Sequence, residues 1–189
     1  MAHPRGGIMN IDVLSFERLA FRVLEETGYL CEDVLEETGK SLVIRKVAQN
    51  HKKELSVLGE KMKLQGYISE MKSMVSELRQ YEVSKEDMEK MLECAKDKPE
   101  LYYKLKDIAV LYDGFFEYLE GKAITREEVL EVLGSVAGKS KKLKESILVL
   151  DGYTGFTPIQ LNLISVLLRR AKKVTIVLTI DAATYEKKH

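Results

Sequence analysis

Hydrophobic and polar positions along this chain follow three patterns in turn: alternation near the start, helical spacing through the middle and continuous apolar runs near the end. In residues 8–14, Ile11 and Val13 fall on one face of an extended chain, and Asn10 and Asp12 fall on the other. Such alternation is typical of a strand with one buried face. The pattern therefore predicts a short β-strand over residues 8–14.

A helix is predicted directly after this strand. Ser15 is a good N-cap, and Gly28 suits the left-handed position that often ends a helix. Apolar side chains between these limits share one arc of the helix surface: Phe16, Leu19, Ala20, Val23 and Leu24. We expect this arc to face the core, whereas Phe21 falls outside it, one turn from Arg18.

Residues 35–145 show helical spacing throughout. Residues 42–58 predict one or two helices, and further helix starts are marked by two capping boxes and an N1 proline: Ser84 with Asp87, Thr125 with Glu128, and Pro99. The helix after the proline carries a long apolar stripe: Leu101, Leu105, Ile108, Tyr112, Phe115 and Leu119. Stripes of this kind pack helices together, so a helical subdomain is predicted.

The last quarter of the chain changes character. Residues 146–150 and 174–180 are continuous apolar runs, as expected for buried parallel strands. Between them, Thr157 as N-cap, Pro158 as N1 and Gln160 as N3 predict a helix to about residue 170. Strand, helix and strand in this order form a βαβ unit. Because two parallel strands do not make a stable sheet alone, we expect the strand at residues 8–14 to add to it.

The patterns together predict a mostly α fold with an α/β portion. We expect residues 1–36 and 146–189 to form a partial α/β domain with a parallel sheet. Residues 37–145 are predicted to form a large helical subdomain inserted into it.

Composition narrows the class of protein. Lys plus Arg and Asp plus Glu number 30 each, so no whole-chain field attracts nucleic acid, and any such binding needs a local patch. No apolar run is long enough to cross a bilayer, and residues 1–9 lack a signal-peptide core. The spacing of Cys31 and Cys94 fits reduced thiols and no metal site. A cytoplasmic setting is expected, with no membrane partner.

An apolar strand ending in Asp151 resembles a Walker B element, in which the carboxylate holds Mg²⁺ beside a nucleotide. Helicase-type ATPases usually carry glutamate at the next position to orient the attacking water, and this chain has Gly152. Without that base we expect poor hydrolysis at this site. An aspartate that merely starts a turn explains the pattern equally well.

Two GKS tripeptides, at residues 39–41 and 138–140, look like the end of a phosphate-binding loop. The full motif needs an earlier glycine, and those places hold Val34 and Leu133. The second tripeptide also precedes a predicted strand, where a phosphate-binding loop would follow one. We therefore predict that the chain has no phosphate-binding loop and no ATPase activity of its own.

The strand-to-helix corner at Ser15 and Phe16 is the strongest candidate site. Arg18 and Phe21 are predicted to present a guanidinium and an aromatic ring together, a pair that suits single-stranded nucleic acid. The other interpretation is that Phe21 packs under the helical insertion. Both remain open from sequence alone.

Two clusters of basic residues lie near the C-terminal end: Lys139, Lys141, Lys142 and Lys144, and then Arg169, Arg170, Lys172 and Lys173. They fit a track for phosphates. A solvated loop and cations that complement a helix dipole explain them as well.

Residues 13–26 (VLSFERLAFRVLEE) and residues 151–158 (DGYTGFTP) closely resemble the B subunit of bacterial AddAB helicase–nucleases, and residues 42–46 are also similar to this family. The resemblance covers essentially the whole chain. It implies a piece of a partial RecA-like (P-loop NTPase-type) helicase domain with its helical insertion. The intact heterodimer with the A subunit would use ATP to unwind and degrade DNA at double-strand breaks until it meets a Chi sequence.

The resemblance also implies roles for particular residues. The Ser15–Phe16 corner would contact single-stranded DNA, and Phe16, Arg18 and Phe21 would belong to the Chi-recognising surface, with Phe21 at a position where some relatives have Trp. Asp151 and Gly152 would be a degenerate Walker B site in a region that scans DNA. ATP, Mg²⁺ and a 4Fe–4S cluster are implied for the parent protein, with no cofactor in these residues.

The alternative function is a helical protein-interaction module. The stripe from Leu101 to Leu119 could seat a protein partner, with the α/β part as support and no contact to nucleic acid. Burial discriminates between the two, because Tyr112 and Phe115 cannot seat a partner if they are buried within the chain.

Overall fold

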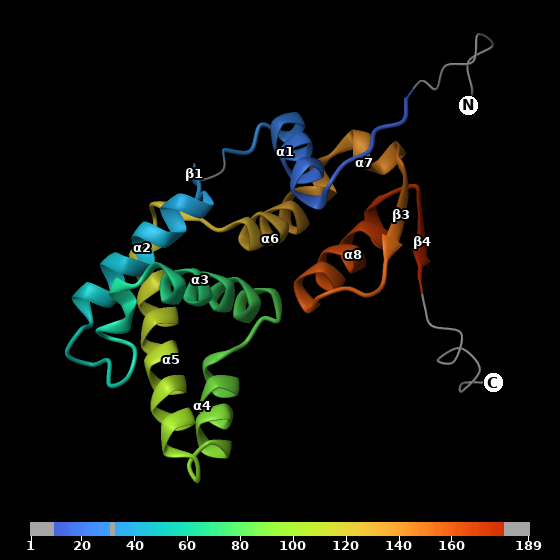
Figure 1. Ribbon diagram of the computed structural model, residues 1–189. Coiled ribbons are helices and arrows are strands. Elements are labelled where there is room, and N and C mark those ends of the chain that lie inside the picture. Colours follow the sequence, from blue (N-terminus) through green and yellow to red (C-terminus); the bar gives the residue numbers. More distant parts are fainter. Residues whose placement is uncertain (1–9, 31–32, 180–189) are drawn as a thin grey trace, which may run out of the picture.

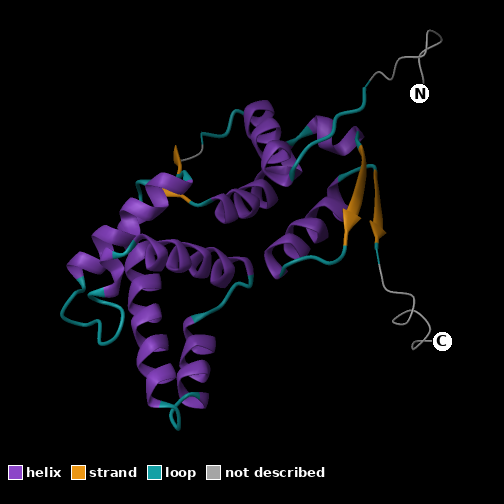
Figure 2. Cartoon of the chain, viewed as in Figure 1, coloured by secondary structure: helices purple, strands orange, loops and turns teal. Residues whose placement is uncertain are grey.

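Helices make up most of the computed structural model, which describes residues 10–30 and 33–179 (Figures 1 and 2). The helices are α1 (Phe16–Thr27), α2 (Glu37–Asn50), α3 (Gln65–Gln80), α4 (Lys85–Cys94), α5 (Pro99–Leu119), α6 (Arg126–Val136), α7 (Lys141–Glu145) and α8 (Pro158–Arg170), with 3-10 turns η1 (Lys61–Lys63) and η2 (Ala137–Lys139). The strands are β1 (Asp33–Val34), β2 (Ala123–Ile124), β3 (Ile147–Tyr153) and β4 (Lys173–Leu178). Within the described ranges, no helix is both long and apolar enough to cross a membrane.

The predicted helix caps are confirmed. The Ser15 side chain accepts the N–H of Arg18 at 3.2 Å, and Gly28 ends α1 with φ of 63°. The capping boxes that begin α4 and α6 are both present: Ser84 with Asp87, and Thr125 with Glu128. Ala20, Val23 and Leu24 are buried on the predicted arc of α1.

The βαβ unit is confirmed. Strands β3 and β4 pair in parallel, with Ile147 opposite Lys173 and Leu150 opposite Ile176, and α8 connects them. This sheet has two strands in the described part of the chain, so the α/β portion is a small parallel sheet. Helix α8 covers one of its faces: Leu148 joins the hydrophobic cluster that contains Leu163.

Two expectations about the strands are corrected. Residues 10–14 form no strand, and Ile11 and Val13 are 64% and 92% exposed; residues 8–9 lie outside the described part. Alternation alone does not make a strand where no neighbour supplies a hydrogen-bonding ladder. The other runs are strands, but Ile147 and Val149 are each 61% exposed, because α8 covers only the opposite face. The predicted end of β4 at Ile180 lies outside the described residues.

The chain has two hydrophobic cores, and Figure 1 shows the helices that contribute to each. The first joins α2, α3 and α5. The second joins α1, α6, α7 and α8, so α6 and α7 pack with the α/β portion. Phe115 is fully buried in the first core and Tyr112 packs partly buried against it. This end of the α5 stripe therefore cannot seat a protein partner.

Two connections between the cores were not foreseen. β1 and β2 form a short parallel pair, with Asp33 opposite Ala123 and Val34 opposite Ile124. This pair places the segment that enters the helical core beside the segment that leaves it. The chain therefore enters and leaves the first core at neighbouring points, through β1 and β2.

Helix α2 ends at Asn50, short of the predicted limit near residue 58. The following turn is held by the buried carboxylate of Asp107, which accepts three backbone N–H groups at 2.7–2.8 Å: those of Ser56, Val57 and Leu58. Charge-assisted hydrogen bonds of this kind compete with a helical backbone. The turn therefore takes its shape from a residue on α5, which local patterns do not reveal.

Candidate nucleic-acid interface

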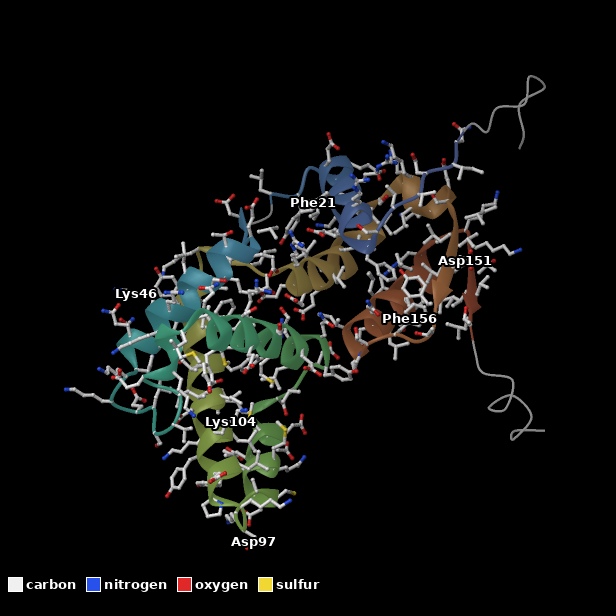
Figure 3. All side chains as sticks on the ribbon, in the orientation of Figure 1. Phe21, Lys46, Asp97, Lys104, Asp151 and Phe156 are labelled. Carbon is white, nitrogen blue, oxygen red and sulfur yellow. The ribbon has the colours of Figure 1, made fainter. Side chains whose placement is uncertain are left out.

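The two motifs at opposite ends of the sequence meet in space. Phe16 begins α1, and its ring lies 5.9 Å from that of Tyr153 at the end of β3. Tyr153 in turn lies 4.6 Å from Phe156, in the loop before α8. All three rings are partly buried. We call Phe16, Tyr153 and Phe156 the aromatic cluster, and Figure 3 marks Phe156 at the end of the strand.

An irregularity in β3 positions these rings. The pairing with β4 shifts register between Leu150 and Tyr153, and Gly152 there has φ of 80°. A bulge of this kind bends a strand and redirects the side chains that follow. Tyr153 is thereby turned toward the start of α1, in agreement with its contact to Phe16.

A cavity of about 470 Å³ opens beside the aromatic cluster. Its wall includes the first residues of α1 and α8 together with side chains of α3 and α6: Ser15, Phe16, Glu17, Glu37, Ser76, Gln80, Arg126, Glu127, Leu130, Tyr153, Thr157, Ile159 and Gln160. Two helix N-termini thus face one space, and such termini carry partial positive charge and free N–H groups. The hydroxyl of Thr157 is buried there without a hydrogen-bond partner.

The carboxylates of this cavity are matched by cations. Three pairs are formed: Arg126 with Glu17 at 3.7 Å, Lys72 with Glu37 at 2.9 Å, and Lys40 with Glu127 at 3.6 Å. The Lys72 ammonium, hydrogen-bonded to Glu37, holds the pKa of that carboxyl below its usual value. The paired carboxylates leave the cavity without the negative charge that would repel a phosphate backbone.

The four predicted DNA-binding residues are distributed over two sides of α1. Ser15 and Phe16 line the cavity, whereas Arg18 and Phe21 stand on the exposed side of the helix. Phe21 is 43% exposed and packs in neither hydrophobic core, so the interpretation that it lies under the helical insertion is wrong. Figure 3 marks Phe21 on α1. The ring and guanidinium are therefore offered to solvent together.

Tyr153 and Phe156 were missed as candidate site residues, although their motif was singled out. Two aromatic residues three positions apart after a strand were the available signal. Their partner Phe16 is more than 130 positions away in the sequence. Only the fold brings these rings together.

Asp151 does not form a metal site by itself. The side chain is exposed, and its Oδ1 accepts the N–H of Gly152 at 2.9 Å. Among residues 10–30 and 33–179, no three His, Cys, Asp or Glu side chains gather closely enough to hold a metal ion. The lone carboxylate does not fit a protein-built Mg²⁺ site, which needs further oxygen ligands.

The sequence predicts that neither GKS tripeptide is a phosphate-binding loop, and in the structure neither one connects a strand to a helix. Residues 39–41 are inside α2, and residues 138–140 run from η2 into α7, ahead of β3. The Ser140 hydroxyl and the N–H groups of Lys141 and Lys142 all donate to the carboxylate of Glu26. The position that an anion could take at this turn is thus filled by the chain's own side chain.

Comparison with known proteins settles the family. The model of the family described as "ADDB, N-terminal" matches residues 1–189. The chain belongs to this family. Membership in the ADDB N-terminal family confirms the resemblance drawn from residues 13–26 and 151–158.

Curated relatives of this ADDB N-terminal chain are named as the B subunit of an "ATP-dependent helicase/deoxyribonuclease". The relative from Lachnoclostridium phytofermentans is 46% identical over 186 residues, which is 98% of this chain and 16% of the relative. The relative from Listeria innocua is 32% identical over 181 residues, 96% of this chain and 16% of the relative. The chain spans about a sixth of the length of these relatives.

Proposed function

We propose that this ADDB N-terminal chain is the part of a helicase/deoxyribonuclease that holds single-stranded DNA and scans it for Chi. The observation that carries the proposal is the aromatic cluster, in which Phe16 meets Tyr153 and Phe156 beside a polar cavity. Relatives of this family are named as B subunits of an ATP-dependent helicase/deoxyribonuclease. The whole B subunit would act in double-strand-break repair, in a heterodimer with an A subunit.

Stacking on partly buried rings is the first element of the mechanism. A ring with one packed side keeps its orientation, so a base can stack on the open side at little entropic cost. The tilted geometry of the Tyr153–Phe156 pair leaves ring surface outside their mutual contact. Stacking is tolerant of sequence, and the cluster therefore supports holding a strand in place.

Polar groups beside the rings supply the second element. The N-termini of α1 and α8 attract phosphate oxygens, and both line the cavity beside the rings. On the outer side of α1, Arg18 and Phe21 offer a guanidinium and a ring, the pair suited to reading guanine or contacting phosphate. Sequence readout is assigned to these two residues.

In the whole protein, the α/β portion would belong to a RecA-like helicase domain, and β3 and β4 would be two strands of its sheet. ATP, Mg²⁺ and a 4Fe–4S cluster would be bound by other regions of the heterodimer. Gly152 in place of a catalytic glutamate fits a region that scans DNA without driving translocation.

Anisotropy of a labelled oligo(dT) strand bound to the intact heterodimer tests the cluster. Phe156→Ala should weaken single-strand binding by about 5- to 150-fold, the loss expected for one stacked base. Phe156→Tyr keeps a ring and should bind close to the wild type. Tyr103→Ala removes an exposed ring on α5 and serves as the matched control. Equal affinities for Phe156→Ala and the control would contradict the proposal.

Chi recognition is tested separately, with DNA that contains or lacks Chi. The double variant Arg18→Ala with Phe21→Ala should lose the Chi-dependent change in degradation while the exonuclease continues to degrade DNA without Chi. An unchanged Chi response in that variant would remove Arg18 and Phe21 from the recognising surface.

A further inference from the structure

Eight cationic side chains gather at the edge of the sheet where β3 and β4 begin. They come from the segment that leads into β3 and from the segment that runs from the end of α8 into β4: Lys139, Lys141, Lys142 and Lys144, and then Arg169, Arg170, Lys172 and Lys173. We call these eight residues the basic edge. The Arg170 guanidinium packs against Gly138, where an added Cβ would lie 3.4 Å from Nε. The N–H of Lys172 donates to the carbonyl of Ser146 at 3.0 Å.

The eight cations of the basic edge outnumber the acidic side chains beside them. All eight side chains are exposed, and within the described ranges none of them forms an ion pair. Residues 138–145 and 169–173 contain one acidic residue, Glu145. The Glu26 carboxylate also lies here and is already bonded to Ser140 and two backbone N–H groups. Because the whole chain is balanced, this edge is a local positive field on an otherwise net negative molecule.

The basic edge is distinct from the candidate single-strand site. It lies where β3 starts at Ile147, whereas the aromatic cluster lies where β3 ends at Tyr153. Six residue steps of strand place the two about 20 Å apart. Residues 138–146 and 168–173 contain no Phe, Tyr, Trp or His, so the edge has no ring on which a base can stack.

We propose that the basic edge binds the phosphate backbone of double-stranded DNA. Exposed lysine and arginine side chains contact phosphates by charge, whereas single-strand sites combine charge with stacking rings. The Arg170 guanidinium at the end of α8 packs against Gly138 of η2, next to Lys139, so the fold holds the two segments of the edge together. The inference goes beyond the proposed single-strand site and does not depend on it.

The salt dependence of duplex binding tests this in the intact heterodimer. The probe is a labelled blunt 40-base-pair duplex, and the variant combines Lys139→Gln, Lys142→Gln, Lys144→Gln and Lys172→Gln. Each lost phosphate contact should lower the slope of log K against log salt by about 0.9, for a total of up to about 3.6. The duplex affinity near physiological salt should fall at least roughly tenfold.

A matched control neutralises four exposed lysines on the surface of the helices and turn around the first core: Lys46, Lys53, Lys104 and Lys106. Figure 3 shows Lys46 on α2 and Lys104 on α5, away from β3. The control should keep the wild-type slope, and oligo(dT) binding should be unchanged in both variants. Equal slopes for the two variants would overturn the inference. An equal loss for duplex and oligo(dT) would overturn it as well, since the edge would then not prefer duplex.

Acetylation of lysines with and without duplex gives a second readout on the wild-type protein. Lys142, Lys144 and Lys172 should be protected by duplex, and Lys46 and Lys104 should react equally in both states. Protection by an acidic peptide but not by duplex would assign the edge to a protein partner and reject DNA. Phe156→Ala should leave the protection intact, so failure of the single-strand site and failure of this inference are distinguishable.

Discussion

Lys40 is a lysine whose side chain is only 1% exposed, and its charge is satisfied across three helices. Its Nζ donates to Ser76 of α3 at 2.7 Å and lies 3.6 Å from Glu127 of α6. Because α2 and α3 belong to the first core and α6 to the second, this buried ion pair ties the two cores together. The GKS tripeptide around Lys40 resembles only the end of a phosphate-binding loop, and no local pattern marks Lys40 as buried.

We expect Lys40→Met to lower the free energy of unfolding by about 3–5 kcal/mol, because the Glu127 carboxylate would remain buried without its cation. Replacing both partners, with Lys40→Met and Glu127→Leu, should recover most of this loss. Denaturant unfolding measures both. Lys90→Met, which breaks an exposed pair with Glu86, should change stability by less than about 1 kcal/mol. A double variant no more stable than the single one would refute the assignment.

Glu26 gives the region around α7 a dependence on pH. The N–H of Lys142 and then the Ser140 hydroxyl hold the pKa of Glu26 below its usual 4.5. At a pH near 4.5 the unfolded chain already binds a proton at Glu26, whereas the folded chain keeps the carboxylate charged. The charged carboxylate therefore contributes its full stabilisation when the pH is above the usual pKa of 4.5. This stabilisation is lost as the pH falls from the usual pKa of 4.5 through the lowered pKa of Glu26 in the folded chain.

Unfolding between pH 7 and pH 3 measures this contribution. Glu26→Gln should be less stable than wild type at pH 7, and the difference should shrink on acidification. A difference that is constant over the whole range would show that the carboxylate charge does not hold the turn.

At the scale of elements, two helical glycines have opposite roles. An added Cβ at Gly114 of α5 would lie 2.8 Å from Cγ1 of Val47, whereas at Gly134 of α6 the nearest atom, on Val166, is at 3.9 Å. Alanine favours a helix over glycine by about 1 kcal/mol. We therefore expect Gly134→Ala to stabilise the chain by up to about 1 kcal/mol.

Gly114→Ala should instead destabilise it, because α2 and α5 pack too closely at that point. Adding Val47→Ala to Gly114→Ala should remove the closest contact and reduce the loss, although the His51 ring still lies 3.2 Å from the added Cβ. Melting temperatures of the variants decide the matter. Stabilisation by Gly114→Ala would mean that the two helices are farther apart than described.

The sequence was informative about elements wherever the determining contacts are local. Ser15, Thr125 and the residues that complete their caps are within a few positions of each other, so the helix starts could be predicted. The β1–β2 pair and the contact of Phe16 with Tyr153 join segments about ninety or more positions apart. Such pairs depend on the packing of both cores, which periodicity does not describe.

At the scale of the whole molecule, one face of the β3–β4 sheet is apolar and open. Its exposed apolar side chains include Ile147, Val149 and Val177, which alternate with the side chains that α8 covers. Exposed apolar strands promote association of chains. We expect the 189-residue chain, purified alone, to associate as its concentration rises.

Val149→Lys should reduce this association, because it places a charge in the middle of the face. Leu42→Lys, at an equally exposed position on α2, is the control. Sedimentation velocity over a concentration series measures the effect. Identical behaviour of the two variants would locate the contact elsewhere.

The main-chain conformation at Gly152 limits which side chains this position can carry. Gly152 has φ of 80°, a conformation that glycine adopts at little steric cost and that other residues adopt rarely. Gly152 belongs to the bulge that turns Tyr153 toward α1. A glutamate installed there would have to strain the backbone or straighten the bulge, and straightening would pull apart the rings that we assign to DNA. The glutamate that the Walker B pattern lacks is therefore incompatible with the main chain that positions the aromatic cluster.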